Sequence, residues 1–421
     1  MSGPTRSLWR HRDFNLLWSG ETVSAVGSQV TVLALPLVAV LILDATPFEM
    51  GVLTAAAYLP FIAFALIVGV YIDRRPTLRP ILIAMDIGRA AAIGVIPLAV
   101  VAGFVSMPLL VVVAFLGGAM TLVFNVAYLP YLPRLVERDM LVDANGRLQA
   151  SQAVAWVAGP TLAGLLVQLV SASVALLLDA VSFVVSAICL LAIRSKEVAT
   201  SRTDHDSWLT DLRSGLIFVA RRPLQRAVAG SAATLNFFGM AQFALIVLYA
   251  TESLGLDPAI IGIAFAVGSV GGIIGAVAAP ILARRFGAGK ATTLAMLGFP
   301  VSLAMVPLAA LVPEGAPAAG MVGGAEFIGA MSVSIFDVMA RSIMQAETPA
   351  EFLGRAGGAM SFLTQSAKPL GALAAGVVAQ AIGVEPTLWI TAIGGLLVLP
   401  WALLTPLGRE SITPAESASG G

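Results

Sequence analysis

Twelve apolar segments, each long enough to cross a lipid bilayer, constrain this chain more than any other feature. A helix rises about 1.5 Å per residue, so about 20 apolar residues span a hydrocarbon core of about 30 Å. The segments form two sets of six, at residues 14–43, 47–71, 79–101, 107–131, 147–170 and 172–193, and at 224–251, 258–283, 291–312, 317–342, 355–382 and 386–405. We therefore predict an all-α membrane protein with twelve transmembrane helices.

The composition supports this prediction. Of the 421 residues, 58% are hydrophobic and 11% are charged, whereas soluble domains have about 45–50% and about 25%. A soluble enzyme, a nucleic-acid binder and a secreted disulfide scaffold are therefore excluded, and the single cysteine, Cys189, cannot form a disulfide within the chain. The first segment is much longer than the apolar stretch of a signal peptide, so we expect it to remain as an uncleaved span.

One polar stretch divides the chain. We predict an N-terminal six-helix bundle at 1–193, a cytoplasmic linker at 194–222 that ends in a short amphipathic helix at 208–220, and a C-terminal six-helix bundle at 223–408. The tail at 409–421 is rich in Ser, Pro and Gly and is expected to be disordered.

Apart from Arg89 and Lys368 inside the spans, lysine and arginine are assigned to alternate loops, with Arg341 and Arg355 in the same loop. The other loops carry acidic residues and no Lys or Arg: Asp44, Glu49, Glu252, Asp257, Glu314 and Glu385. Cytoplasmic loops of membrane proteins carry the excess of Lys and Arg. We therefore expect a multi-pass protein of a bacterial-type cytoplasmic membrane with both termini in the cytoplasm.

The two halves resemble each other. Phe115–Val126 aligns without a gap with Phe327–Val338, and Pro47-x-x-x-Gly51 recurs as Pro258-x-x-x-Gly262, both at an offset of about 210 residues. Any two apolar helices can align by chance, but a common offset over several features favours a duplicated six-helix unit. Because both halves begin on the same side, the repeats are parallel, and a binding site is expected between them near the membrane midplane.

The loop after the second span carries a motif. It reads Gly69-Val-Tyr-Ile-Asp73-Arg74-Arg75-Pro76-Thr77-Leu78-Arg79 and resembles the signature loop of the major facilitator superfamily, Gly-x-x-x-Asp-Arg-x-Gly-Arg-Arg. The matching residues are Gly69, Asp73, Arg74 and Arg79, while the central glycine is absent. The resemblance implies two pseudo-symmetric six-helix bundles.

The resemblance also implies a cytoplasmic gate. Asp73 would accept hydrogen bonds from the N-terminus of the helix that starts near Arg355, where the helix dipole favours an anion. In the alternative interpretation, the arginines of this loop only determine topology.

A second motif lies in the fifth span. Gly159-Pro160-Thr161-Leu162-Ala163-Gly164 is similar to the Gly-Pro-x-x-Gly-Gly motif associated with exporters of that superfamily. Gly159, Pro160 and Gly164 would bend the helix and let a neighbour from the other half pack closely. The runs at 86–89, 141–151 and 178–183 look like the enterobactin-exporter and macrolide-efflux branch, which implies proton-driven export of a small organic molecule.

Charged residues inside the spans are functional candidates, because each costs about 2.5–3.5 kcal/mol at a helix centre. Asp86 and Arg89 lie three residues apart on one helix face and are expected to neutralise each other. Asp179 is expected to have a structural hydrogen-bonding role. The remaining candidates are Glu21, Glu326, Asp337 and Lys368.

We predict that these four residues couple transport to protons. Glu326 and Lys368 lie at similar depth by helical rise, so they could pair. A carboxylate opposite an ammonium stays ionised, whereas one that loses its partner in an apolar site takes a proton. A permanent structural bridge between the two is the alternative, and His11 and His205 fall in cytoplasmic segments, so no histidine relay is expected.

Aromatic, methionine and amide side chains of the spans expected around the central cavity are the candidates for contact with cargo. They are Phe124, Asn125, Asn236, Phe237, Met240, Gln242, Phe327 and Phe336. Such walls suit a lipophilic, partly polar ligand, and the near-absence of cavity arginine argues against an organophosphate or polyanion.

The sequence thus predicts a proton antiporter that exports a small lipophilic or amphipathic molecule, such as a drug, a macrolide-like or a siderophore-like compound, by alternating access. A nutrient importer or a lipid or lysolipid transporter of the same fold is the alternative. No metalloprotease, hydrolase or phosphate-binding motif is present, so we expect no enzyme activity, no cofactor and no metal. The protein is expected to act as a monomer on a small-molecule substrate, protons and the bilayer.

Overall fold

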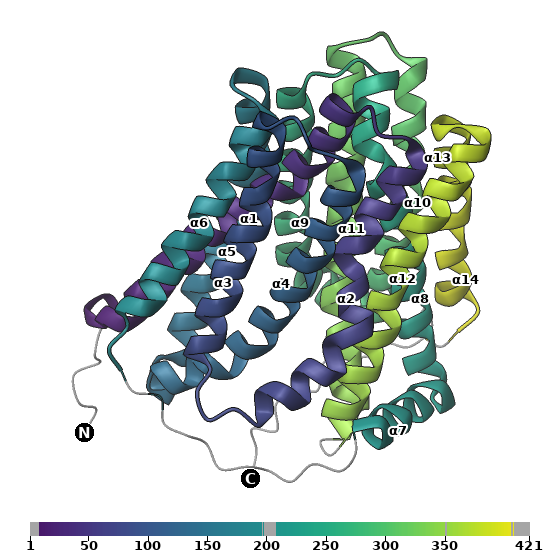
Figure 1. Ribbon diagram of the computed structural model, residues 1–421. Coiled ribbons are helices and arrows are strands. Elements are labelled where there is room, and N and C mark those ends of the chain that lie inside the picture. The colour runs from purple at the N-terminus through teal and green to yellow at the C-terminus, as the bar shows by residue number, and fades with distance from the viewer. Residues whose placement is uncertain (1–7, 196, 198–207, 350–351, 406, 408–421) are drawn as a thin grey trace. The chain divides into compact units, whose positions relative to one another are not determined.

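The computed structural model describes residues 8–195, 197, 208–349, 352–405 and 407 (Figure 1). Every regular element in this part of the chain is helical, as predicted. The helix expected at the end of the linker is α7, Trp208–Arg221. The predicted disordered tail, 409–421, and linker residues 198–207 lie outside the described residues.

Packing divides the chain into two compact units. Unit 1 comprises Met1–Ala45 and Ala56–Asp204, and unit 2 comprises Thr46–Ala55 and His205–Gly421. Helix α2, Pro47–Asp73, therefore starts in unit 2. There Gly51 lies so close to α12 that a Cβ on it would come within 2.7 Å of the Ala372 carbonyl oxygen. The bundle boundaries expected at residues 193 and 223 stay a prediction.

Unit 1 is built around α1 and α3. Helix α1 packs on α5 and α6, and α3 packs on α4 and α6. The bounds of these helices are Arg12–Leu43 for α1, Arg79–Val101 for α3, Met107–Leu135 for α4, Leu141–Leu169 for α5 and Ala172–Ala192 for α6.

Unit 2 repeats this packing with α8 in the place of α1 and α10 in the place of α3. Helix α8 packs on α12 and α13, α10 packs on α11 and α13, and α9 lies along α11. The bounds are Pro223–Leu248 for α8, Pro258–Phe286 for α9, Ala288–Leu308 for α10, Ala316–Glu347 for α11, Leu353–Ile382 for α12, Val384–Gly395 for α13 and Leu399–Leu403 for α14. The repeated pairing agrees with the duplicated six-helix unit.

Eleven helices of the described chain are long and apolar enough to cross a membrane. Helix α12 has 30 residues but is more polar than these eleven helices, since it carries Gln365, Lys368 and Gln380. Helix α11 runs five residues past the predicted end at 342, to Glu347. The last predicted span is interrupted, because the 3-10 turn Leu396–Val398 separates α13 from α14.

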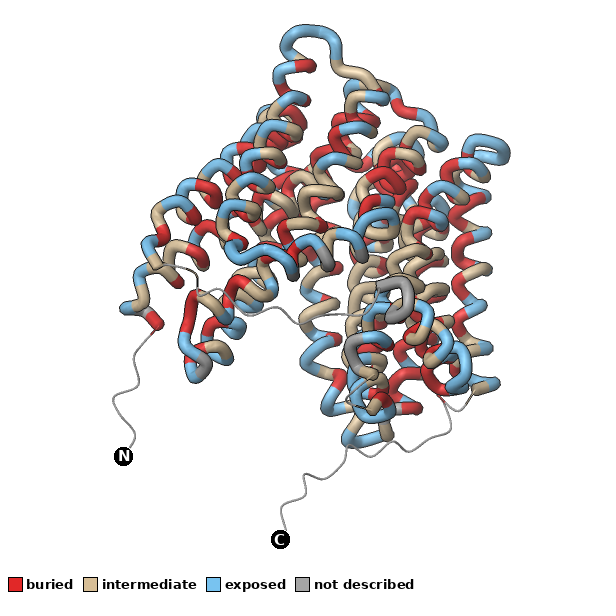
Figure 2. Tube along the Cα trace, turned by 60° about the horizontal axis from the view of Figure 1, so that its bottom comes forward, coloured by how far each residue is buried: buried red, intermediate tan, exposed pale blue. Residues whose placement is uncertain are grey.

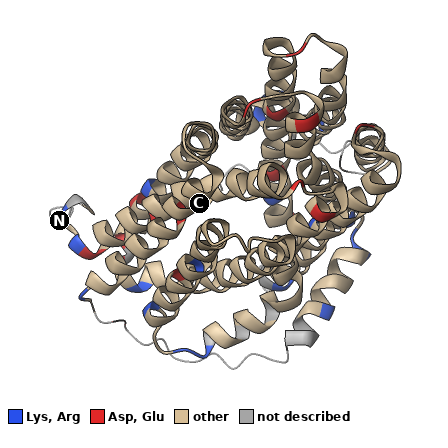
Figure 3. Cartoon of the chain, turned by 45° about the horizontal axis from the view of Figure 1, so that its top comes forward, with Lys and Arg blue, Asp and Glu red and all other residues tan. Residues whose placement is uncertain are grey.

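The buried side chains of each unit follow the helix faces that turn toward neighbouring helices (Figure 2). Exposed Leu, Val and Ile residues cover many of the other helix faces, as expected where lipid replaces water. Charged residues are sparse along the long helices (Figure 3). The charged residues that do lie within these helices are therefore the candidates for functional or structural polar contacts.

Candidate functional site

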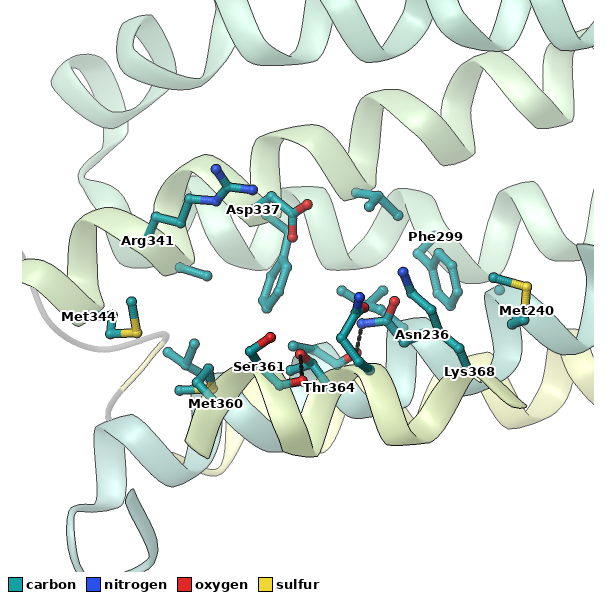
Figure 4. Close-up of a pocket in the computed structure, with 18 of the residues that line it drawn as sticks. Asn236, Met240, Phe299, Asp337, Arg341, Met344, Met360, Ser361, Thr364 and Lys368 are labelled. Atoms are coloured by element: carbon teal, nitrogen blue, oxygen red, sulfur yellow. Dashed lines mark hydrogen bonds between the residues drawn. The ribbon is translucent and has the colours of Figure 1, made fainter. Parts of the chain in front are cut away.

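The larger described cavity lies in unit 2, among helices α8, α10, α11 and α12, and has a volume of about 640 Å³. This is within the range of about 300–1,000 Å³ that is typical of small-molecule sites. Three predicted cargo contacts line it, namely Asn236, Met240 and Phe336. Asn236 donates its amide to the Ala232 carbonyl at 2.9 Å, which fixes the side chain on the cavity wall (Figure 4).

The same cavity contains three charged residues. Asp337 and Arg341 lie one turn apart on α11, and Lys368 lies on α12. Asp337 interacts electrostatically with both cations. Figure 4 shows Asp337 and Arg341 side by side, with Ser361 and Thr364 across the cavity from them. The cavity thus combines an apolar wall with a compact group of charges.

Lys368 interacts electrostatically with Asp337. Its predicted pairing with Glu326 stays a prediction. Glu326 packs against α9, where a Cβ on Gly268 would come within 2.8 Å of the Glu326 Cβ. Glu326 does not line the cavity that Lys368 lines.

A smaller cavity of about 170 Å³ lies in unit 1, among α1, α4 and α5. Its polar lining residues are Glu21, Thr22, Tyr128, Gln149, Ser151 and Gln152. The Glu21 Oε1 atom and the Tyr128 hydroxyl are buried and have no hydrogen-bond partner among the described residues. A buried polar group of this kind calls for a water, an ion or a proton. The proton-coupling role of Glu21 stays a prediction.

The expected pair on α3 is confirmed. Arg89 donates to the Asp86 carboxylate, and both side chains are buried. The guanidinium also lies 4.3 Å from the ring centroids of Phe124 and of Phe183. Phe124 was predicted to contact cargo, but it is buried beneath Arg89 and lines neither of the two cavities.

Asp179 has the hydrogen-bonding role that was expected of it. Its carboxylate accepts from Thr31 of α1 and, at 3.1 Å, from Ser182 of its own helix. Gly27 of α1 faces this pair, and a Cβ there would collide with the Ser182 hydroxyl and the Asp179 carboxylate. The contact therefore ties α1 to α6 within unit 1.

Four further predicted cargo contacts line neither described cavity. Phe237 packs edge-on against Phe238, with ring centroids 5.0 Å apart. Phe327 presents its backbone to Gly271 of α9, and Gln242 is buried. Asn125 is exposed.

The predicted gate loop is held by a residue that the motif did not indicate. Glu197 accepts from the backbone amides of Leu78 and Arg79, at 2.6 and 2.8 Å, and so caps the start of α3. It also lies 3.6 Å from the Arg134 guanidinium, while Arg79 donates to the Ile193 carbonyl at 2.6 Å.

The structure describes fewer contacts for the other predicted gate residues than for Arg79. No side chain lies within 4 Å of a Cβ built on Gly69, and Arg74 is exposed. The Asp73 side chain falls outside the described part, and with it the predicted contact to the helix near Arg355.

The glycine motif of α5 packs within its own unit. A Cβ on Gly159 would collide with the Gln29 side chain of α1, and Pro160 and Gly164 are buried in the same helix. The neighbour that approaches Gly159 is therefore α1 of unit 1, and the expectation that it comes from the other half is wrong for this glycine.

The comparisons with known proteins decide the family. The model of the Major Facilitator Superfamily matches residues 17–371 and 232–419. This chain belongs to the Major Facilitator Superfamily. This chain is 25% identical over 404 residues to the multidrug efflux pump Tap of Mycolicibacterium fortuitum. The alignment covers 94% of this chain and 96% of that protein. The chain is 23% identical over 406 residues to the macrolide efflux protein A of Streptococcus pyogenes, with the same coverage.

Solved structures of other transporters share the fold of this major facilitator transporter. A bacterial homologue of the iron transporter ferroportin, in an inward-facing state, matches with a TM-score of 0.73 at 19% identity and covers 96% of this chain and 100% of that one. At this identity the likeness establishes the fold alone.

The cavity of the transporter also contains residues that sequence reasoning missed. Arg341 lies one residue inside the predicted end of its span at 342 and was counted with the loop arginines, because cytoplasmic loops carry the excess of Lys and Arg. The polar and methionine residues of the first turns of α12 gave no signal in an apolar-segment search: Met360, Ser361, Thr364 and Gln365. Their spacing of three to four residues on one helix face was the signal that could have found them. No cluster of three or more metal-ligating side chains is found among the described residues.

Proposed function

We propose that this major facilitator transporter exports a small lipophilic or amphipathic organic molecule across the cytoplasmic membrane in exchange for protons, by alternating access. The names of its relatives in Mycolicibacterium and Streptococcus, a multidrug and a macrolide efflux protein, support this direction and this class of cargo. In this proposal both termini face the cytoplasm, the protein acts as a monomer, and the bundles are those expected at 1–193 and 223–408.

The observation that carries the proposal is the cavity of unit 2, in which a carboxylate, two cations and an apolar wall come together. Cargo would lie against Met240, Phe336 and Asn236. Such a surface, with methionine and aromatic rings and a few convergent polar groups, suits ligands of varied shape.

The carboxylates Glu21 and Asp337 would carry the protons. Both line cavities formed by helices, and a carboxylate changes its affinity for protons when its charged neighbours move. Glu326 would contribute in a conformation in which Lys368 approaches it. The residues Gly69, Asp73, Arg74 and Arg79 would form the cytoplasmic gate, and Gly159, Pro160 and Gly164 would let α5 move against its neighbour.

Transport into membrane vesicles tests the proposal. Everted vesicles with the protein, energised to be acidic inside, should accumulate radiolabelled erythromycin or ethidium above vesicles without it, and a protonophore should abolish the difference. The variant Asp337→Asn should lose most of this uptake. The exposed Arg285 of α9 provides the control Arg285→Gln, which should retain uptake. Accumulation in right-side-out vesicles instead would favour the importer alternative and contradict export.

A further inference from the structure

The charges that line the cavity of unit 2 do not balance. Arg341 and Lys368 bring two positive charges and Asp337 brings one negative charge, which leaves an excess of one positive charge. No other Asp, Glu, Lys, Arg or His is among the described residues that line it. A cavity with an excess of one sign of charge raises the local concentration of ligands of the opposite sign.

The three charged residues lie at successive depths. Measured along the helices from the end at which α11 finishes and α12 begins, Arg341 lies ~9 Å, Asp337 ~15 Å and Lys368 ~22 Å from the helix terminus. Asp337 is therefore placed between the two cations. Figure 4 shows the same order along the cavity, from Met344 and Arg341 to Lys368 and Met240.

The rest of the lining is suited to an amphipathic ligand. Met344 and Met360 lie at the Arg341 end, and Phe299 and Met240 lie at the other end. The hydroxyl and amide side chains of Ser361, Thr364 and Gln365 lie on α12 near the cations. Arginine binds carboxylates with two parallel hydrogen bonds, so Arg341 is well suited to an acidic group.

We infer that the cargo of this cavity is an amphipathic organic anion, whose acidic group binds between Arg341 and Lys368 and competes there with Asp337, while its apolar part lies against the methionines and phenylalanines. The inference rests on the proposal that the cavity takes cargo, and it specifies the charge of that cargo. The sequence argued against an organophosphate or polyanion because cavity arginine was nearly absent, whereas Arg341 lines this cavity.

Equilibrium dialysis of the full-length protein in lipid nanodiscs tests the inference with a matched pair of probes. Dansyl-norleucine carries one carboxylate, and dansyl-norleucine amide is neutral but otherwise the same. The acid is expected to bind about tenfold more tightly than the amide, because only the acid carries a charge that the two cations attract. Equal binding, or tighter binding of the amide, would overturn the inference.

Charge variants of the cavity sharpen the test. Arg341→Gln and Lys368→Met should each weaken acid binding about tenfold and leave amide binding unchanged, whereas Asp337→Asn should strengthen acid binding. Arg285→Gln on the outer face of α9 should change neither. An acid preference that survives in both Arg341→Gln and Lys368→Met would contradict the proposed site. If either variant fails to fold, Arg341→Lys and Lys368→Arg provide a second test, because both keep the positive charge. Each should still bind the acid more tightly than the amide, and loss of this preference in both would overturn the inference.

The binding experiment does not depend on transport. If the acid preference is absent while erythromycin is still exchanged for protons, only this inference fails. If the acid preference is present but vesicles accumulate no cargo, the anion site stands and the proposed export fails.

Discussion

Asp337 on α11 and Lys368 on α12 line the same cavity and interact electrostatically. Asp337 also lies one helical turn from Arg341, so its carboxylate has a cation on its own helix and another on the facing helix. This arrangement connects two helices of unit 2 through charge rather than through apolar packing alone. It also makes the electrostatic state of the cavity depend on a single carboxylate.

A double-mutant cycle should detect the coupling between these two residues. Asp337→Asn and Lys368→Met should each slightly lower the thermal unfolding midpoint of the detergent-solubilised protein, because each removes an electrostatic attraction between α11 and α12. The double variant should be less destabilised than the sum of the two, with a coupling energy of about 0.2–1 kcal/mol. Additive effects would argue that the two side chains do not interact.

Arg89 should be more important for stability than for transport. Its guanidinium is buried, bonded to Asp86 and placed over two aromatic rings, so Arg89→Met leaves the Asp86 carboxylate buried without its cation. We expect a loss of about 3–5 kcal/mol, measured as a lower unfolding midpoint in detergent. The double variant Asp86→Asn with Arg89→Met should recover much of this loss. If the single variant were as stable as the wild type, the buried pair would not hold unit 1 together.

Two glycines of α5 should respond differently to the same change. Gly159 faces Gln29 without room for a Cβ, whereas a Cβ on Gly146 meets no atom within 4 Å. Gly159→Ala should therefore destabilise the protein by about 1–3 kcal/mol, while Gly146→Ala should be neutral or stabilise it by up to about 1 kcal/mol, since alanine favours helix. Equal unfolding midpoints for the two variants would contradict the close approach of α1 to α5.

Glu197 should hold the start of α3. Its carboxylate accepts from two backbone amides and lies beside Arg134, so Glu197→Gln removes a charged cap and should cost about 0.5–2 kcal/mol. Hydrogen exchange at residues 78–82 should become faster, while exchange in the middle of α6 should not change. Unaltered protection at 78–82 would show that the cap has no local effect.

The helices could be predicted because the signals that specify them are local. Apolar length gave the spans, and a spacing of three residues was sufficient to place Asp86 and Arg89 on one face of α3. Helix ends were less certain, because hydropathy falls before the backbone stops being helical. Arg341, one residue from the predicted end at 342, was counted with the loop arginines, although α11 continues to Glu347.

Contacts between helices could not be predicted in the same way. Helical rise gives the depth of a residue but not the direction in which it points from the helix axis. Glu326 and Lys368 were expected at similar depth, yet Glu326 packs against α9 while Lys368 lines the cavity with Asp337. In the same way, the glycine motif of α5 indicated close packing but could not identify Gln29 of α1 as the neighbour.

The most direct test of the account is proton release driven by substrate. Purified protein in liposomes that contain a pH-sensitive dye should move protons when erythromycin is added, and the wild type should give a signal that protein-free liposomes lack. The account predicts that Glu21→Gln and Asp337→Asn each abolish the signal, while Arg285→Gln retains it. Undiminished proton movement in both carboxylate variants would contradict proton exchange through these two cavities.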